Sequence, residues 1–264
     1  MLTAAAAEKY LAFVRISLTH ARRDRGELYG RAVFFTVILG VLSSLWRAAG
    51  ESGLMANAEP RTLLWYVAAT EWILMSTPQL HLDIQETVRR GDVVYQLGRP
   101  ISYVGAVFAE GVGVVAARAP VLGVVAFLCA FAFTGWIPPF GVLAPIAAFG
   151  LVASLLLTAL DVVIGLTAFW IDDVAPVYWV WQKLLFVCGG LMMPIQLYPS
   201  VIQRVAAFTP FPSILAGPAS FVLNGQAAAP GLLARNLAAW SIATAVVVGF
   251  MFRRAAHALA VNGG

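Results

Sequence analysis

The sequence contains few charged residues for its length. Lysine, arginine, aspartate and glutamate make up 11% of the 264 residues, whereas 61% are hydrophobic. Soluble domains carry about 25% charged residues, so this chain could not cover a soluble globule with a polar surface. The scarcity of charge excludes an ordinary soluble enzyme and a disordered protein. It predicts an integral membrane protein that crosses the bilayer several times.

The chain also has few of the residues that disulfides and metal centres require. Its two cysteines, Cys129 and Cys188, lie inside apolar runs, and we interpret them as small core residues. The three histidines, His20, His81 and His257, lack the paired spacing of a zinc protease. We interpret them as surface or interface residues. The sequence therefore predicts no metal and no cofactor in this chain.

A phosphate-binding loop is missing as well. Such a loop needs a Gly-Lys pair, because its backbone amides and its lysine together hold the phosphates of a nucleotide. The only lysines are Lys9 and Lys183, and neither follows a glycine. The Gly-x-Ser-x-Gly motif of serine hydrolases is also absent. We therefore expect that the chain itself is not an enzyme.

Six apolar runs predict transmembrane helices. A span needs about 20 apolar residues, and the sequence contains no flexible linker that would divide the chain. The predicted spans are about 29–49, 62–80, 102–136 (with the part from about 117 to 135 in the membrane), 140–170, 177–197 and 232–252. We expect Arg253 and Arg254 to end the last span. The sequence thus predicts an all-α integral membrane protein with one transmembrane domain, residues 1–264.

Two segments outside these runs have a distinct character. Residues 1–28 have helical spacing of polar and apolar residues, which predicts a helix in the cytoplasmic membrane interface; a solvated leader is the alternative. Residues 198–231 are apolar but broken by prolines and glycines, so no uninterrupted helix there reaches spanning length. We expect short re-entrant or interfacial helices in that segment, buried by other parts of the protein.

The basic residues predict the orientation of the chain in the membrane. Most of the 17 lysines and arginines lie before the first span, in the loop 81–101 and in the C-terminal tail. Basic residues concentrate on the cytoplasmic side of membrane proteins. We therefore expect both termini and the loop 81–101 to be cytoplasmic, and segment 198–231 to be extracellular.

Three of the charged residues within the apolar runs lie at a similar predicted depth in the membrane. Glu71, Asp161 and Lys183 are each about 10–14 Å from a cytoplasmic helix end at the rise of an α-helix. Charged groups inside a membrane are costly and often mark substrate or ion pathways. The similar depth favours an ion pair between Asp161 and Lys183, with Glu71 nearby. Such a pair would either belong to a translocation path or lock the helix packing.

Three stretches of the sequence resemble a known family of membrane proteins. They are GRPISY at 98–103, FWIDDVAPVYWVWQKLLFVCGGLMMPIQLYP at 169–199 and FTPFPSILAGPASFVLNG at 208–225. Together with the length and the layout of the spans, they resemble an uncharacterised branch of the type-2 ATP-binding-cassette exporter permeases. The resemblance covers nearly the whole chain and is most specific over 169–225.

The resemblance implies partners and a mechanism. Such permeases pair with a second copy or a sibling permease in the bacterial inner membrane. They export hydrophobic or amphipathic molecules such as lipids, glycans, antibiotics and peptides. Each pair binds two cytoplasmic ATPases, which would hold ATP and Mg²⁺. The loop 81–101 would carry a coupling helix, at about 82–98, that contacts the ATPase, and the N-terminal helix would contact it too. The candidate coupling residues are Gln85, Glu86, Arg89 and Arg90.

Other functions remain open at this stage. An ion- or proton-coupled transporter could use Glu71, Asp161 and Lys183 as a relay without any ATPase. A membrane scaffold or assembly protein is a further alternative, and an intramembrane enzyme is disfavoured by the missing motifs. Nothing in the sequence predicts binding of nucleic acid, whereas contact with membrane lipids follows from the composition. The substrate is not assigned.

Overall fold

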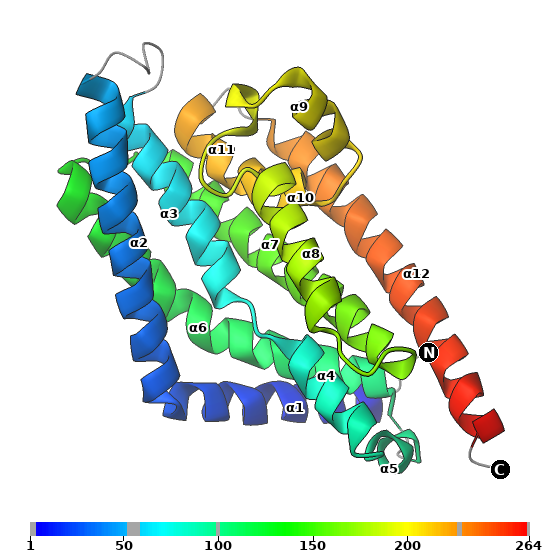
Figure 1. The fold of residues 1–264 in the computed structure, drawn as a ribbon. Coiled ribbons are helices and arrows are strands. Elements are labelled where there is room, and N and C mark those ends of the chain that lie inside the picture. Colours follow the sequence, from blue (N-terminus) through cyan, green and yellow to red (C-terminus); the bar gives the residue numbers. More distant parts are fainter. Residues whose placement is uncertain (1–3, 52–58, 99–100, 226–228, 263–264) are drawn as a thin grey trace.

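The computed structural model describes residues 4–51, 59–98, 101–225 and 229–262, and helices dominate them (Figure 1). This confirms the all-α prediction for the described part of the chain. The α-helices are α1 (Ala4–Arg23), α2 (Arg25–Glu51), α3 (Pro60–Ser76), α4 (Leu80–Arg89), α5 (Val93–Leu97), α6 (Tyr103–Thr134), α7 (Phe140–Leu166), α8 (Ala175–Gly189), α9 (Ser200–Ala207), α10 (Phe211–Ile214), α11 (Ala216–Asn224) and α12 (Pro230–Asn262). Single 3-10 turns lie at Thr167–Phe169 and Ile195–Leu197.

Four stretches of helix are long and apolar enough to cross a membrane. They are Arg25–Ala48, Tyr103–Thr134, Phe140–Phe169 and Pro230–Ala256. They correspond to the predicted first, third, fourth and sixth spans. Helix α12 continues past Arg253 and Arg254 without a break to Asn262, so the end of the helix does not mark the end of the predicted last span.

The predicted second and fifth spans form shorter helices than expected. Helix α3 has 17 residues and α8 has 15, which at the α-helical rise gives about 25 and 22 Å, against a hydrocarbon core of about 30 Å. Helix α3 ends at Ser76 because Pro78 has no N–H and disfavours helix in the residue before it. Helix α8 ends where Gly190 adopts a left-handed backbone with φ of 67°. The count of six spans therefore stays a prediction.

Helix α3 forms the centre of the bundle. It packs against α2, α6, α7 and α11, and its apolar side chains are almost wholly buried. Two of its polar side chains hold the turn after α8: the Tyr66 hydroxyl donates to the carbonyl of Gly190 at 2.7 Å. The Thr70 hydroxyl donates to the carbonyl of Leu191, also at 2.7 Å. A short helix can occupy this place because neighbouring helices cover it on its sides.

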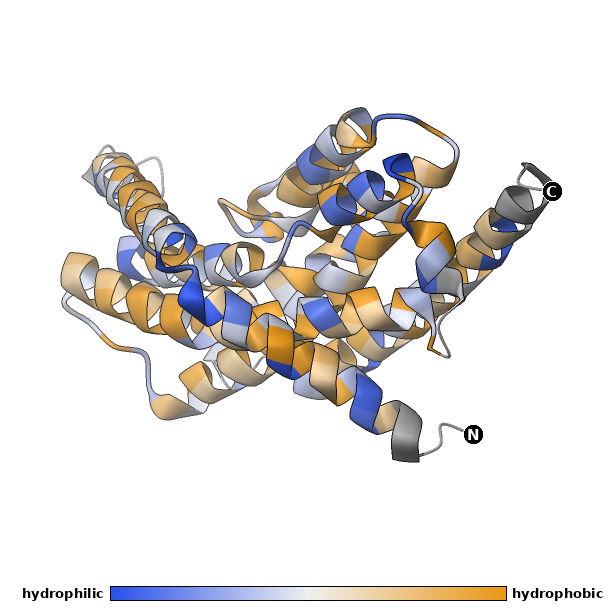
Figure 2. Ribbon diagram, turned by 90° about the horizontal axis from the view of Figure 1, so that it is seen from below, coloured by the Kyte–Doolittle hydropathy of each residue, from blue (hydrophilic) through white to orange (hydrophobic). Residues whose placement is uncertain are grey.

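The N-terminal helix lies across one end of the bundle, as Figures 1 and 2 show from two directions. Helix α1 packs on the first half of α6, where Gly113 allows the two backbones to approach: an added Cβ there would overlap the carbonyl oxygen of Val14. The chain turns at Asp24, whose carboxylate accepts a hydrogen bond from the N–H of Glu27 at 3.1 Å. Because Asp24 caps α2, the first helix ends at Arg23 and not at residue 28 as predicted.

The two ends of the bundle differ in what they carry. Figure 1 places α1, α4, α5 and the C-terminal part of α12 at one end, and α9, α10 and α11 at the other. The predicted broken segment 198–231 thus forms three short helices before α12; residues 226–228 lie outside the described ranges. That these helices are re-entrant in a membrane stays a prediction.

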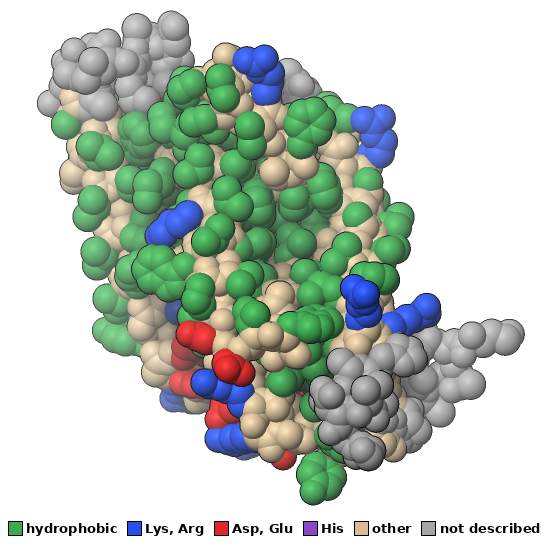
Figure 3. Space-filling model, turned by 45° about the vertical axis from the view of Figure 1, so that its right-hand side comes forward, with side chains coloured by type: hydrophobic (Ala, Val, Ile, Leu, Met, Phe, Trp, Pro, Cys, Tyr) green, Lys and Arg blue, Asp and Glu red, His purple; other side chains and the backbone are tan. Residues whose placement is uncertain are grey.

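The sides of the bundle expose many apolar side chains. Val41 on α2 is 62% exposed, and Val246 and Phe250 on α12 are 65% and 62% exposed. Figure 3 shows hydrophobic side chains over most of one face, with acidic side chains gathered near its lower end. Apolar sides between polar ends are the arrangement that a bilayer requires.

Candidate functional site

The start of α4 is held by a buried carboxylate from α7. The N-cap residue of α4, Gln79, makes no capping hydrogen bond with its side chain. Instead, Asp161 accepts two hydrogen bonds from His81, one from its backbone N–H at 3.0 Å and one from Nδ1–H at 2.8 Å. An ionised carboxylate can only accept, so Nδ1 carries the proton. Asp161 therefore satisfies an amide in the first turn of α4 and fixes the orientation of the imidazole.

Two further contacts attach α4 to the beginning of α8. The ring of His81 stacks on that of Tyr178, with centroids 3.9 Å apart and planes inclined by 16°. One turn further along α4, the side-chain carbonyl of Gln85 accepts a hydrogen bond from the N–H of Val174 at 2.7 Å. One face of α4 is therefore bonded to α7 and to the turn before α8. Gln85, a predicted coupling residue, belongs to this inner face.

The outer face of α4 carries the other predicted coupling residues. Glu86, Arg89 and Arg90 are all exposed. Glu86 and Arg90 form an ion pair one helical turn apart, and such exposed pairs contribute little to stability. These three charges lie at the end of the bundle that also holds α1, where a soluble partner could reach them.

The carboxyl of Asp83, also on α4, has a shifted acidity. Burial raises the pKa of this carboxyl above its ordinary value, and the negative charges of Asp161 and Glu86 raise it further. His81 and Arg118 oppose the rise without cancelling it. The exposed Asp83 side chain is therefore less stable in its ionised form than an isolated carboxyl in water would be.

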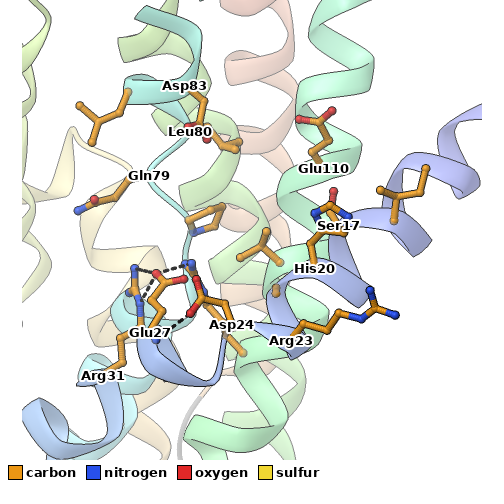
Figure 4. A pocket seen from close by; sticks show the side chains of 16 residues that line it. Ser17, His20, Arg23, Asp24, Glu27, Arg31, Gln79, Leu80, Asp83 and Glu110 are labelled. Carbon is orange, nitrogen blue, oxygen red and sulfur yellow. Dashed lines mark hydrogen bonds and ion pairs between the residues drawn. The ribbon is translucent and has the colours of Figure 1, made fainter. Parts of the chain in front are cut away.

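A second polar cluster lies where α1, α2 and α6 meet the turn between α3 and α4 (Figure 4). It lines a cavity of about 820 Å³. At its centre the carboxylate of Glu27 accepts hydrogen bonds from Arg31 at 3.0 Å and from Arg118 at 2.5 Å. Arg118 is only 7% exposed, so Glu27 supplies the counter-charge that its burial requires.

The same two arginines cap the end of α3. Arg31 donates to the carbonyl of Met75 at 2.9 Å, and Arg118 donates to the carbonyl of Thr77 at 3.3 Å. Carbonyls in the last turn of a helix lack partners within it, and positive charge is favoured there. The break between α3 and α4 is thus bonded to α2 and α6 on one side, and to α7 through Asp161 on the other.

Two of the predicted intramembrane residues line one cavity between α2, α3 and α8. Glu71 and Asp161 are each 3% exposed and both border this space of about 400 Å³. Much of the remaining wall is apolar or aromatic and includes Phe34, Trp181 and Phe186. The structure therefore brings Glu71 and Asp161 to a common space.

The predicted ion pair between Asp161 and Lys183 is not formed. Asp161 is bonded to His81, and Lys183 lies on the exposed side of α8. The Nζ atom of Lys183 is 4.9 Å from the ring centroid of Trp179 and 5.4 Å from that of Phe186. The position of a residue along a helix does not determine which way its side chain points around the helix axis. On α8 the side chain of Lys183 points outward. Lys183 is also not among the residues that line the cavity.

Of the two alternatives for His81, a surface or an interface residue, the structure excludes the surface. This histidine is 2% exposed and lies between α7 and α8. His20 is exposed as expected, and the side chain of His257 lies outside what the structure describes. The cluster of Glu27, Arg31 and Arg118 was not predicted from the sequence. The sequence did contain one indication of it. Arg118 lies in the apolar stretch 102–136, and a charged residue there needs a counter-charge.

The cysteines and acidic residues form no metal centre in the described ranges, where no group of three or more histidine, cysteine, aspartate or glutamate residues could hold an ion. Cys188 is buried and Cys129 partly buried, and both pack in the main hydrophobic core as free thiols. Their interpretation as core residues is confirmed.

The helices and their exposed apolar sides define a multi-pass membrane protein. A family model described as "ABC-2 family transporter protein" matches residues 62–263, which is most of the chain. The chain therefore belongs to the ABC-2 transporter family, which confirms the resemblance seen in the sequence. Its membrane domain is that of an ABC transporter permease, a kind of membrane subunit that works in general with an ATP-binding-cassette partner. No curated protein and no solved structure gives a match.

Proposed function

We propose that this chain is the permease subunit of an ATP-driven exporter in the bacterial inner membrane. It would act as a dimer, with a second copy or a sibling permease, and two cytoplasmic ATPases would bind ATP and Mg²⁺ and supply the energy. Membership of the ABC-2 family over residues 62–263 supports this proposal.

The observation that carries the proposal is the two-faced geometry of α4. Its outer face presents Glu86, Arg89 and Arg90 to solvent, while its first turn is bonded to Asp161 of α7. Mixed charges suit docking to a soluble protein. A displacement of α4 by such a partner would reach α7 and α8 directly, because the hydrogen bonds of His81 and Gln85 join them. This is the connection that a coupling helix needs.

The cavity that Glu71 and Asp161 border is the best candidate for part of the translocation path. It adjoins the helices to which α4 is attached, so movement of α4 would change its shape. Helices α9, α10 and α11 lie at the opposite end of the bundle (Figure 1). We propose that they close the outer end of the path.

The proposal is tested by co-expression with an ATP-binding-cassette ATPase; one encoded by a neighbouring gene is the first candidate. The double variant Glu86→Gln/Arg89→Gln should lose co-purification of the ATPase or its coupling to substrate. The matched control is Glu59→Gln/Arg61→Gln, which removes an exposed ion pair of 2.6 Å near the start of α3. The control should keep both properties.

Two outcomes would contradict the proposal. If no cassette ATPase associates with the chain, the exporter function is wrong. If the α4 variant retains substrate-stimulated ATP hydrolysis as well as the control does, α4 is not the coupling element.

A further inference from the structure

The cavity between α2, α3 and α8 has the size and the wall of a ligand site. Its volume of about 400 Å³ falls within the range of small-molecule pockets, roughly 300–1,000 Å³. Phe34 from α2 and Trp181 and Phe186 from α8 contribute aromatic surface to it, and Leu74 from α3 adds apolar surface. Such a wall suits the hydrophobic body of an amphipathic molecule.

The acidic side chain of Glu71 in this wall has no partner among the residues that the structure describes. The carboxylate of Glu71 makes no hydrogen bond or ion pair with any residue in the described part of the chain, although it is 3% exposed. Two other buried charged residues in the described ranges differ in this respect. Arg118 is bonded to Glu27, and Asp161 is bonded to His81. A buried carboxylate is costly unless a positive charge or hydrogen-bond donors meet it.

The other charged residues around the cavity do not neutralise the negative charge of Glu71. Asp161 and Arg31 also border the space. The guanidinium of Arg31 is bonded to Glu27 and to the carbonyl of Met75, so it is directed to other acceptors. Both oxygens of Asp161 accept hydrogen bonds from one residue of α4. Among the described residues, the unpaired charge that borders this cavity is therefore the negative charge of Glu71.

We propose that this cavity binds an amphipathic cation, with its positive charge beside Glu71 and its hydrophobic body against Phe34, Trp181 and Phe186. The aromatic faces add attraction for a cation, since the face of an aromatic ring is electronegative. The proposal rests on the proposed function in one respect: it takes the bound cation to be the class of substrate that the exporter moves.

Two lipophilic ions of the same shape provide the test. Tetraphenylphosphonium is a cation and tetraphenylborate an anion, and equilibrium dialysis measures how much of each ion binds. Binding is measured on the full chain in lipid nanodiscs. Because the two ions enter bilayers to different extents, the readout is the change in apparent affinity of each ion between wild type and variant. Replacement Glu71→Gln should weaken phosphonium binding at least about tenfold, equivalent to ~1.4 kcal/mol, and should leave borate binding unchanged or stronger.

Two control variants separate charge from folding. Glu71→Asp keeps the negative charge and should retain the preference for the cation. Glu59→Gln removes an exposed carboxylate just before the same helix and should change neither affinity. All variants are compared with wild type for monodisperse elution and for unfolding temperature.

A measurement on the wild-type chain covers the case in which Glu71→Gln does not fold. Dicyclohexylcarbodiimide modifies carboxyl groups in apolar surroundings, and mass spectrometry locates the adduct. Tetraphenylphosphonium should protect Glu71 from modification, and tetraphenylborate should not. Equal protection by both ions, or loss of both affinities together in Glu71→Gln, would overturn the proposal.

The binding test is independent of the ATPase. If the chain couples to an ATPase but shows no Glu71-dependent preference for the cation, the exporter function stands and the substrate class is wrong. If the preference is found and no ATPase associates, the cavity is a cation site and the exporter function is wrong.

Discussion

The carboxylate of Asp161 is the acceptor on which the first turn of α4 depends. Its replacement by alanine would leave two buried donors of His81, the backbone N–H and Nδ1–H, without an acceptor. Such a loss costs about 1–3 kcal/mol. We expect Asp161→Ala to lower the unfolding temperature of the detergent-solubilised chain by several degrees, measured by differential scanning fluorimetry. The exposed Asp172→Ala, in the turn before α8, is the control and should have little effect.

The same measurement separates the observed contact from the ion pair predicted from the sequence. A double-mutant cycle between Asp161→Ala and His81→Ala should show strong coupling, because each replacement removes the same side-chain contact. A cycle between Asp161→Ala and Lys183→Ala should be additive, because these side chains do not meet. Strong coupling in the second cycle would restore the predicted pair and contradict the position of Lys183.

A raised pKa at Asp83 predicts a pH-dependent cost to stability. Burial and the nearby charges of Asp161 and Glu86 favour the protonated form in the folded protein. The folded state therefore binds this proton more tightly than the unfolded state, so ionisation costs stability above the raised pKa. That cost disappears as the pH falls through the raised pKa. We expect Asp83→Asn to raise the unfolding temperature at neutral pH.

The advantage of Asp83→Asn should narrow as the solution becomes acidic, when the wild-type carboxyl is itself neutral. Asp92→Asn, an exposed change in the turn before α5, controls for the loss of one negative charge at this end of the bundle. Equal unfolding temperatures of Asp83→Asn and wild type at neutral pH, or a gap that widens in acid, would show that the carboxyl is not destabilised there.

At the residue scale, the sequence predicted the burial of two acidic side chains, but it did not predict which residues they bond to. Glu71 and Asp161 are buried as expected, because a carboxylate inside an apolar run has few exposed positions. The pairing of Asp161 depends on which way α8 turns Lys183 and on where α4 begins. Both follow from tertiary packing, which hydropathy along the chain does not encode.

At the element scale, the contact between α1 and α6 makes a sharp prediction. Gly113 lies where the backbone of α1 comes closest, and an added methyl group would overlap the carbonyl of Val14 and the side chain of Ser17. Overpacking of this kind costs about 1–3 kcal/mol. We expect Gly113→Ala to loosen α1, which limited trypsin digestion at Arg22 and Arg23 would detect as faster cleavage.

Gly30 on α2 is the matched control for this change. An added Cβ at Gly30 meets nothing within 4 Å, so Gly30→Ala should keep the cleavage rate of wild type. It should also gain up to ~1 kcal/mol in helix propensity. Equal cleavage of the two variants and wild type would mean that α1 is not packed on α6 in solution.

Sequence predicted the existence of most helices but not where the second and fifth spans end. The apolar run at 62–80 continues past Pro78, and hydropathy alone therefore places the end of a span there. The backbone ends α3 at Ser76, since proline cannot continue the hydrogen bonding of the helix. At the end of α8 the left-handed turn at Gly190 is fixed by hydrogen bonds from α3. Of these two helix ends, only that of α3 could have been predicted from the sequence, because Pro78 marks it.

At the scale of the whole molecule, the arrangement of the two ends determines how the chain can lie in a membrane. Helices α4 and α5 lie at one end and α9 at the other (Figure 1). Tyr95 on α5 is 79% exposed, and Phe208 at the end of α9 is 85% exposed. Apolar sides between these ends would place the two residues on opposite sides of the bilayer. The concentration of basic residues near α1 and α4 predicts that the end with Tyr95 faces the cytoplasm.

Cysteine labelling tests this orientation directly. In a background with Cys129→Ala and Cys188→Ala, the variant Phe208→Cys should react with a membrane-impermeant maleimide in intact cells. Tyr95→Cys should react only after the cells are permeabilised, because its side chain would face the cytoplasm. The reverse pattern would show that the basic residues do not set the orientation. Labelling of both positions from the same side would contradict the two-ended arrangement itself, since α5 and α9 could then not lie at opposite ends of a bundle that crosses the membrane.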